Sequence, residues 1–179
     1  MKLLVLAVVF ITSKGLVNAQ NINIPDPILK EYLVTRLAAA NDPTGIYDIR
    51  VDANGDGEIQ ISEAEAIIAL RIRNQDFINP EGLEHFVNLV ALDLSGNEIE
   101  SIDVSVYQGM RELDLGGNNL LDIDLSSLLN LMSLDLGGNE LMDIDLSNNL
   151  QVEELFIAGN KMTTLITVSY THLTLPTKA

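Results

Sequence analysis

Apolar and polar positions follow one fixed pattern over the second half of the chain. Asparagine recurs every 21 residues, at Asn97, Asn118, Asn139 and Asn160, and each closes a stretch of the form LDLSGN, LDLGGN or LFIAGN. Apolar columns keep the same step and begin at Leu89, Leu92, Leu94, Ile99 and Ile102. A strict repeat of this length is typical of a solenoid, in which no coil can bury its own apolar side chains and neighbouring coils must stack.

The L-x-L part of each repeat predicts one short strand per coil. Residues alternate sides along a strand, so both leucines point inward and their neighbours point outward on a shared parallel sheet. We expect the outward residues to line a concave face: Ala91, Asp93, Glu112, Asp114, Ser133, Asp135, Glu154 and Phe156. The asparagine amides should bind backbone groups in a buried bend. So short a repeat leaves little room for a helix, and the convex segments should be extended or turn-like.

Residues 20–82 lack this repeat and predict a small helical cap. Asp26 and Pro27 favour the start of a helix, and apolar residues with helical spacing continue to about Asn41. The alanine-rich stretch from Ser62 to Leu70 predicts a second helix. The predicted fold class is therefore an α/β solenoid, with the cap at residues 20–82 and the repeats at residues 83–167.

The stretch DANGDGEIQISE, residues 52–63, has the pattern of an EF-hand calcium loop. Such a loop takes oxygen ligands from positions 1, 3, 5, 7, 9 and 12 and has a glycine at position 6. Gly57 stands at position 6 and Ile59 at the apolar position 8. The ligands of Ca²⁺ would be the side chains of Asp52, Asn54, Asp56 and Glu63, the carbonyl of Glu58, and Gln60 through a water molecule.

Calcium is expected to be structural in this chain. A sensor EF-hand opens a groove between paired helices, whereas here there is one loop and no clear helix that enters it. The ion would fix the cap against the open end of the solenoid, whose apolar edge needs a cover. The alternative is an Asx-rich turn that caps the helix after Ser62 without any metal.

The repeats and the loop together resemble a known group of proteins. Residues 83–167 are similar to leucine-rich repeat proteins of the bacterial secreted and surface type, internalin-like in architecture. The segment NPEGLEHFVNL, residues 79–89, resembles the entry that precedes their first full repeat, and the cap resembles that of members with an N-terminal calcium loop. The resemblance implies that the repeats bind another protein and that the chain is not an enzyme.

The first residues predict export. Lys2 precedes an apolar run from Leu3 to Ile11, and Val17-Asn18-Ala19 places small residues at the −3 and −1 positions of a signal-peptidase site. We therefore expect residues 1–19 to be a signal peptide and the protein to be secreted or at the cell surface. A membrane anchor is the alternative, but the apolar run is about half of the roughly 20 residues that a spanning helix needs.

The last residues break the repeat. Residues 168–179, VSYTHLTLPTKA, lose both the 21-residue pattern and the acidic character. They resemble the conceptual translation of a tagmentation sequencing adapter, and the alternative is a C-terminal strand, because Val168, Tyr170 and Thr171 favour strands. We expect a non-native tail and a repeat region that is truncated near Thr167.

The charge balance argues against polyanionic partners. The chain carries 26 acidic and 10 basic residues, and all the acidic residues lie between positions 20 and 167. Such a surface repels nucleic acid and anionic membranes, so we expect neither as a partner. No stretch predicts a transmembrane segment, and we expect a monomer. The absence of cysteine excludes disulfides, so stability must come from packing, with bound metal as a further source.

Catalytic groups are scarce. His85 is the one histidine of residues 20–167, and the chain has no cysteine and no G-x-S-x-G. The acidic columns do not require paired acid and base chemistry, because copying one repeat also copies its aspartates. Asp103, Asp124 and Asp145 are interpreted as turn caps that act with the serines two residues further on, with a second calcium ladder as the alternative.

These features favour a secreted or cell-surface recognition protein. Its acidic concave face, with Phe156 as an exposed aromatic residue, would bind a basic protein partner. An alternative from another class is that the repeats are the targeting or spacer region of a larger secreted enzyme whose catalytic domain is missing. A structural component of a surface layer is a third hypothesis.

Overall fold

The computed structural model describes residues 20–41 and 47–166. The predicted signal peptide at residues 1–19 and the predicted non-native tail at residues 168–179 lie outside these residues, so both stay predictions. Within the described residues, no helix is long and apolar enough to cross a membrane.

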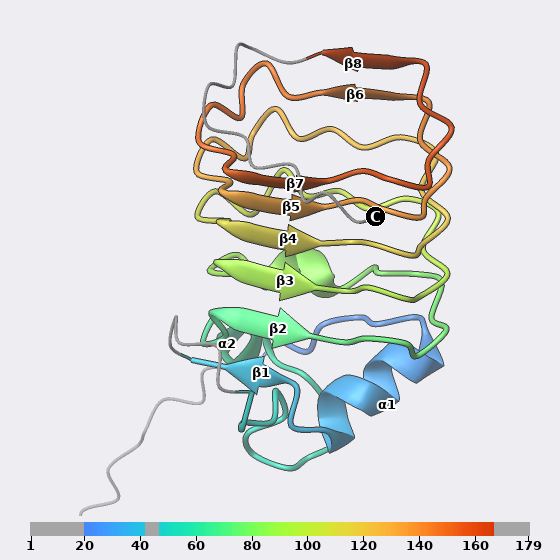
Figure 1. Ribbon diagram of the computed structural model, residues 1–179. Helices are drawn as coiled ribbons and strands as arrows, with labels where there is room; N and C mark the ends of the chain where they lie inside the picture. Colours follow the sequence, from blue (N-terminus) through green and yellow to red (C-terminus); the bar gives the residue numbers. More distant parts are fainter. Residues whose placement is uncertain (1–19, 42–46, 167–179) are drawn as a thin grey trace, which may run out of the picture.

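One strand per coil builds a parallel sheet along the whole solenoid (Figure 1). Leu92 pairs with Leu113, and Leu134 with Leu155, so each coil is one 21-residue repeat. The parallel strands are β2 (Ala69–Arg71), β3 (Ala91–Asp93), β4 (Glu112–Asp114), β5 (Ser133–Asp135) and β7 (Glu154–Phe156), and β1 (Ala39–Ala40) pairs antiparallel with β2 at the edge. The predicted solenoid and its repeat length are confirmed.

The strand leucines point into a core that is continuous with the cap. Leu115 is fully buried and Leu113 is 2% exposed, and their equivalents in the neighbouring coils are as deeply buried. A single apolar cluster extends from Ile22 in the cap to Leu155 in the last coil. Each buried leucine contributes about 1.5–3 kcal/mol, and stacking is what removes these side chains from water.

Buried asparagines join each coil to the coil before it. The Nδ2 group of Asn118 donates to the carbonyl oxygens of Leu94 and Leu115, both at 3.0 Å, and its Oδ1 accepts the N–H of Ile99 at 3.1 Å. Asn139 makes the same three bonds one coil further on. These backbone groups lie away from water and would otherwise be unpaired. The predicted role of the asparagine column is confirmed.

The convex side is extended and turn-like, as predicted. Residues 101–110 and 122–132 form turns and irregular segments. Further along, β6 (Asp143–Asp145) pairs with β8 (Thr164–Ile166) in a second parallel sheet. Asp103 accepts the N–H of Ser105 at 2.9 Å, and Asp124 and Asp145 make the equivalent bond. The interpretation of this aspartate column as turn caps is confirmed.

The first helix is shorter than the sequence predicts. It begins as expected, because Asp26 accepts the N–H groups of Ile28 and Leu29. However, α1 (Pro27–Thr35) ends at Thr35 and not near Asn41. The chain leaves the helix because Ala39 and Ala40 pair with β2, so the sheet takes backbone groups that a longer helix would have used.

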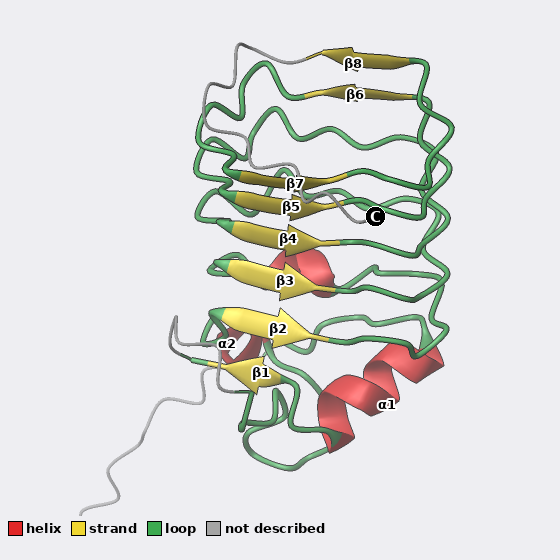
Figure 2. Cartoon of the chain, viewed as in Figure 1, coloured by secondary structure: helices red, strands yellow, loops and turns green. Residues whose placement is uncertain are grey.

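The second predicted helix is mostly absent. α2 (Ile61–Ala64) is a single turn, and residues 69–71 form β2 instead of helix. Alanine and leucine favour helices in isolation, but pairing on both edges of β2 overrides that preference. Figure 2 shows the consequence: α1 and α2 lie at the cap end, and the remaining coils carry only a short 3₁₀ turn, η1 (Leu83–His85).

The parallel sheet therefore begins inside the range assigned to the cap. Leu70 pairs with Leu92, one residue more than the repeat length away. Asn74 takes the place of the bend glycine with φ +52°. The N–H of Gln75 donates to Asn97 Oδ1 at 3.0 Å, so this coil is also bonded to the asparagine of the next coil. Residues 69–75 thus form an irregular first coil that connects the cap to the repeats.

Three substitutions in one coil should lower the free energy of unfolding by different amounts. Leu115→Ala should cost about 2–5 kcal/mol because it leaves a cavity. Asn118→Ala should cost about 1–3 kcal/mol for each buried group that it leaves unpaired. Asp122→Ala removes an exposed side chain and should change stability by less than about 0.5 kcal/mol. Urea unfolding midpoints measure all three, and a larger loss for Asp122→Ala would contradict the inward and outward assignment.

Candidate functional site on the concave face and in the N-terminal loop

The strands place the predicted concave residues in two in-register columns. Asp93, Asp114, Asp135 and Phe156 are neighbours on successive strands. The second column consists of Ala91, Glu112, Ser133 and Glu154. All of these except Glu154 line a shallow hollow of about 210 Å³, and Glu154 accepts a hydrogen bond from Ser133 Oγ at 3.2 Å. The predicted surface is one continuous face.

Two arginines enter this face from the irregular first coil. Arg73 forms an ion pair with Asp93, and Arg71 Nε lies 3.4 Å from the same carboxylate. Arg71 also stacks on Tyr47, with its guanidinium carbon 4.0 Å from the ring centroid. Sequence reasoning missed all three residues because their segment was assigned to the cap. The signal was the alternation of ALRIRN at residues 69–74, which matches ALDLSG at residues 91–96.

Asp93 is consequently compensated within the protein. Asp93 is only 6% exposed, and its Oδ1 also accepts the hydroxyl of Ser95 at 2.8 Å. The bond to Asp93 raises the pKa of Arg73. Because Arg71 and Arg73 both lie against it, Asp93 leaves little free charge for a partner.

The free negative charge lies further along the column. Burial raises the pKa of Asp114, and the charges of Asp93 and Asp135 raise it further, whereas the Gly116 N–H and Arg73 oppose the shift. Arg73 Nη2 lies 3.8 Å from Asp114 Oδ2, a weaker contact than the one with Asp93. The face therefore runs from a basic, aromatic end at Tyr47 to an acidic centre, and then to Phe156.

The first glycine of each LDLGGN stretch makes room for these carboxylates. The N–H of Gly116 donates to Asp114 Oδ1 at 3.0 Å. A Cβ atom on Gly116 would lie 3.1 Å from Asp135 Oδ1 and 3.3 Å from Asp114 Oδ1. A side chain at Gly116 would therefore require these carboxylates to shift by a few tenths of an ångström. The second glycine has another role, since Gly117 has φ +66° and turns the bend.

The predicted calcium loop wraps around its first aspartate. Asp52 is 5% exposed, and its two carboxylate oxygens accept the N–H groups of Gly55, Asp56 and Gly57 at 2.7–3.2 Å. Gly57 has φ +83°, which is the sharp turn expected at position 6. The backbone of this half of the loop thus has the curvature that the sequence pattern requires.

The other predicted ligands converge on the same turn. Glu63 reaches back to the N–H groups of Ala53 and Gln60, at 2.9 and 3.0 Å. Asn54 Nδ2 donates to Asp56 Oδ2 and to Gln60 Oε1, at 3.1 and 2.8 Å. Lys30 forms a salt bridge of 2.8 Å with the Glu58 side chain, which leaves the Glu58 carbonyl as the expected ligand.

The predicted donor set would need one adjustment to hold calcium. Among the described residues, no three Asp, Glu, His or Cys side chains gather closely enough to hold a metal ion. The loop instead places side-chain amide groups of Asn54 and Gln60 against the carboxylate of Asp56. Both amides carry an oxygen of similar size, and turning those oxygens toward a cation would complete the set of ligands.

His85 lies outside both regions. Its Nε2 atom is 3.6 Å from Glu84 Oε1, and both side chains are substantially exposed. It does not line the concave hollow. His85 and Glu84 are two neighbouring side chains within η1.

Comparisons with known proteins identify the fold. Residues 109–131 match the family described as Leucine Rich Repeat. The functional domain of InlJ from Listeria monocytogenes is 24% identical with a TM-score of 0.58, over 64% of this chain and 25% of that chain. The internalin inlF from Listeria monocytogenes is 23% identical with a TM-score of 0.56, over 78% and 45%. The leucine-rich repeat ectodomain of the receptor kinase SOBIR1 from Arabidopsis thaliana is 22% identical with a TM-score of 0.50, over 63% and 66%.

These likenesses establish a leucine-rich-repeat solenoid. They confirm the predicted fold class and the similarity to internalins in architecture. This chain spans a quarter of the InlJ domain and less than half of inlF. No curated protein sequence matches the chain.

The two kinds of aspartate should give opposite pH dependences. Because the pKa of Asp114 is raised, the stability it contributes is present at low pH and is lost as the pH rises through that pKa. Asp114→Asn should therefore stabilise the protein at about pH 7 and have little effect below about pH 3. The Ser126 side chain and N–H lower the pKa of Asp124, so Asp124→Asn should destabilise at neutral pH, and this effect should fade as the pH falls through the lowered pKa.

Urea midpoints between about pH 3 and pH 7 test both variants. A shift of the same sign for the two variants at neutral pH would show that their environments do not differ as described.

Proposed function

We propose that this protein is a secreted or cell-surface recognition protein that binds a basic protein surface through its concave face. The observation that carries the proposal is the continuous acidic and aromatic surface around Asp114, Asp135 and Phe156. Phe156 is 39% exposed although it is a large apolar residue. Exposed aromatic residues next to charges are typical of surfaces that anchor a partner.

Electrostatics favour a cationic partner for the centre of this face. Arg71 and Arg73 lie against Asp93, and Arg73 makes only a longer contact of 3.8 Å with Asp114. Among the described residues, no lysine or arginine forms an ion pair with Glu112 or Asp135. A lysine or arginine of the partner over this centre would relieve the repulsion between stacked carboxylates. Complementary charge increases the association rate and selects the partner more than it increases affinity.

Export is the second part of the proposal. The expected signal peptide supplies the route, and the lack of cysteine is compatible with any redox compartment. The SOBIR1 ectodomain among the similar structures is a precedent for this fold outside the cell. A protein exported with this acidic surface would also meet calcium at millimolar concentration.

The third part is structural calcium in the loop at residues 52–63. Asp52, Asn54, Asp56, Gln60 and Glu63 converge on one turn, and the Glu58 carbonyl completes the expected set. When bound, the ion would supply positive charge among these oxygens. The loop is tied to the cap, since Ile59 is fully buried and its carbonyl accepts the N–H of Ile22 at 2.8 Å. Calcium would thus stabilise the cap that covers the first coil.

Calcium should raise the melting temperature of the purified protein. With a Kd of about 10⁻⁴–10⁻³ M, as for extracellular modules, the gain should be about 1.4 kcal/mol at ten times the Kd. Glu63→Gln should weaken this calcium-dependent shift, and Glu65→Gln, an exposed neighbour outside the loop, should not. Calorimetric titration and thermal unfolding measure both effects. No heat and no thermal shift at millimolar calcium would disprove the proposed site.

Reversal of the concave charges should abolish partner binding. Random peptides displayed on phage are selected on the wild-type protein, and we expect enrichment of lysine, arginine and aromatic residues. The selected peptides should lose binding to a variant with Asp114→Lys and Asp135→Lys. They should keep it on a variant with Glu98→Lys and Glu153→Lys, which carries the same change of charge outside the concave hollow. Peptides that bind the first variant as well as the wild type would place the binding surface elsewhere.

A further inference from the structure

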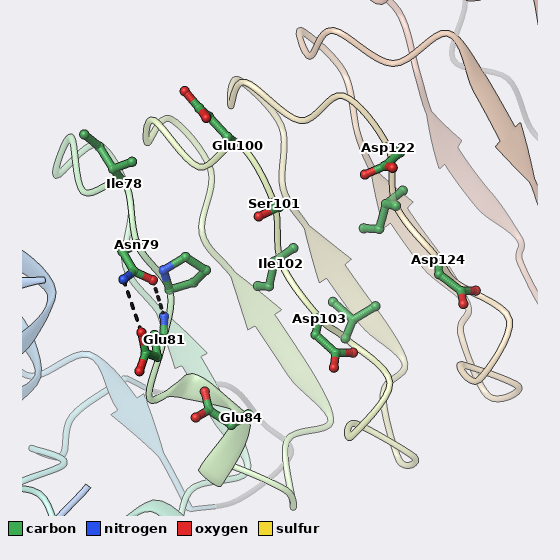
Figure 3. Close-up of a pocket in the computed structure, with 13 residues that line it drawn as sticks. Ile78, Asn79, Glu81, Glu84, Glu100, Ser101, Ile102, Asp103, Asp122 and Asp124 are labelled. Carbon is green, nitrogen blue, oxygen red and sulfur yellow. Dashed lines mark hydrogen bonds between the residues drawn. The ribbon is translucent and has the colours of Figure 1, made fainter. Parts of the chain in front are cut away.

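A second hollow lies on the convex side, beside the entry to the repeats (Figure 3). Its volume is about 900 Å³, several times that of the concave hollow. One wall is the segment 78–84, which leads into η1, and the other consists of the convex segments 100–104 and 122–124 of two successive coils. We call this feature the convex groove. None of its residues belongs to the concave face or to the calcium loop.

The walls of the convex groove are held in place before any partner binds. Asp26, the N-cap of α1, also accepts the N–H groups of Ile78 and Asn79 at 3.0 and 3.2 Å. On the inner side, the hydroxyl of the buried Tyr107 donates to the Leu83 carbonyl at 2.9 Å. One groove wall is therefore anchored to both the cap and the second coil. A preformed surface binds without the entropy cost of ordering its own loops.

The convex groove has an apolar floor and an acidic rim. Ile102 and Ile123 are half-buried in the floor, and Ile78 is 54% exposed at the edge. Six carboxylate side chains surround them: Glu81, Glu84, Glu100, Asp103, Asp122 and Asp124. In the described part of the chain, no lysine or arginine contacts any of the six. Figure 3 shows the acidic groups spread along both walls.

Because the six carboxylates are distributed along both walls, they suit several basic side chains of a polypeptide better than one metal ion. No three of these carboxylates gather closely enough to hold a metal within the described residues. Lysine and arginine side chains can reach separate carboxylates, and their aliphatic stems can cover isoleucine. A second copy of this chain does not fit the groove, because the chain has a net charge of −16 and would be repelled.

We propose that the convex groove is a second docking surface, for an extended segment of a partner protein that alternates basic with small apolar residues. Its basic side chains would pair with the rim, and its apolar residues would cover Ile102 and Ile123. The convex segments 100–104 and 122–124 belong to neither strand of the β6–β8 sheet, so the partner would lie across them without displacing a strand. This surface is independent of the concave face.

A defined peptide tests the proposal. The probe is a fluorescein-labelled nine-residue peptide with lysine at alternate positions and valine between, and fluorescence anisotropy measures its binding at near-physiological salt. Glu100→Lys with Asp122→Lys should weaken binding by at least about tenfold, because neither side chain makes a contact whose loss would disturb the fold. Asp114→Lys with Asp135→Lys on the concave face carries the same change of charge and should alter binding by less than about twofold.

Comparison of the two variants and of a second peptide distinguishes this inference from the function proposed above. Equal weakening by the two variants would indicate general attraction to an acidic protein and overturn the inference. Loss with the concave variant alone would assign the peptide to the concave face, which overturns the inference and supports the proposed function. A peptide with serine in place of valine should bind more weakly, and equal affinity would refute a role for the apolar floor. No binding of the lysine and valine peptide by the wild type would also overturn the proposal.

Direct mapping completes the test. A photoreactive group in the peptide should attach to residues 78–84, 100–104 or 122–124, and attachment elsewhere would contradict the assignment. If circular dichroism shows that the charge-reversal variant is unfolded, Glu100→Gln with Asp122→Asn replaces it. That pair removes the same two charges and keeps similar side-chain shapes, and unchanged affinity in it would count against the proposal.

Discussion

The solenoid depends on the pairing of backbone groups inside its bends. Apolar burial drives the coils together, but it is not directional and does not fix which residue faces which. Each buried asparagine offers both a donor and an acceptor, and Asn118 uses them to join Leu94, Ile99 and Leu115 in two coils. The amide therefore hydrogen-bonds the backbone groups of the bend and also fixes the register between neighbouring coils. A leucine in its place would bury as well but leave backbone groups unpaired.

Register has an electrostatic consequence. Identical residues stack on neighbouring strands that lie about 4.8 Å apart, so a copied aspartate becomes a column of like charges. The protein relieves this column at one end, where Arg71 and Arg73 meet Asp93. The repulsion remains at Asp114, whose pKa is raised by burial and by the charges of Asp93 and Asp135. The concave centre is therefore a place where an external cation is favoured.

The cap links the calcium loop, the sheet and the convex side. Ile59 of the loop is buried in the common core, and β1 adds an antiparallel strand to the edge of the sheet. Asp26, the N-cap of α1, holds the segment that forms one wall of the convex groove. Stabilising the loop with calcium would thus also stabilise the edges of both proposed surfaces. Buried side chains of all these regions belong to one continuous apolar core.

The sequence by itself determined the repeat, the inward leucines, the buried asparagines and the turn-capping aspartates. Each is a local pattern copied at a constant step, and repetition makes a weak signal unambiguous. It also indicated the order of oxygen donors in the loop around Gly57. Only the tertiary structure decided where the sheet begins, since Leu70 pairs with Leu92 at a step one residue longer than the period. It also brought Arg73 onto Asp93, although the match of ALRIRN to ALDLSG is a signal for that coil. The end of α1 at Thr35 and the convex groove were decided by the tertiary structure alone, because both depend on contacts between segments that lie far apart in the sequence.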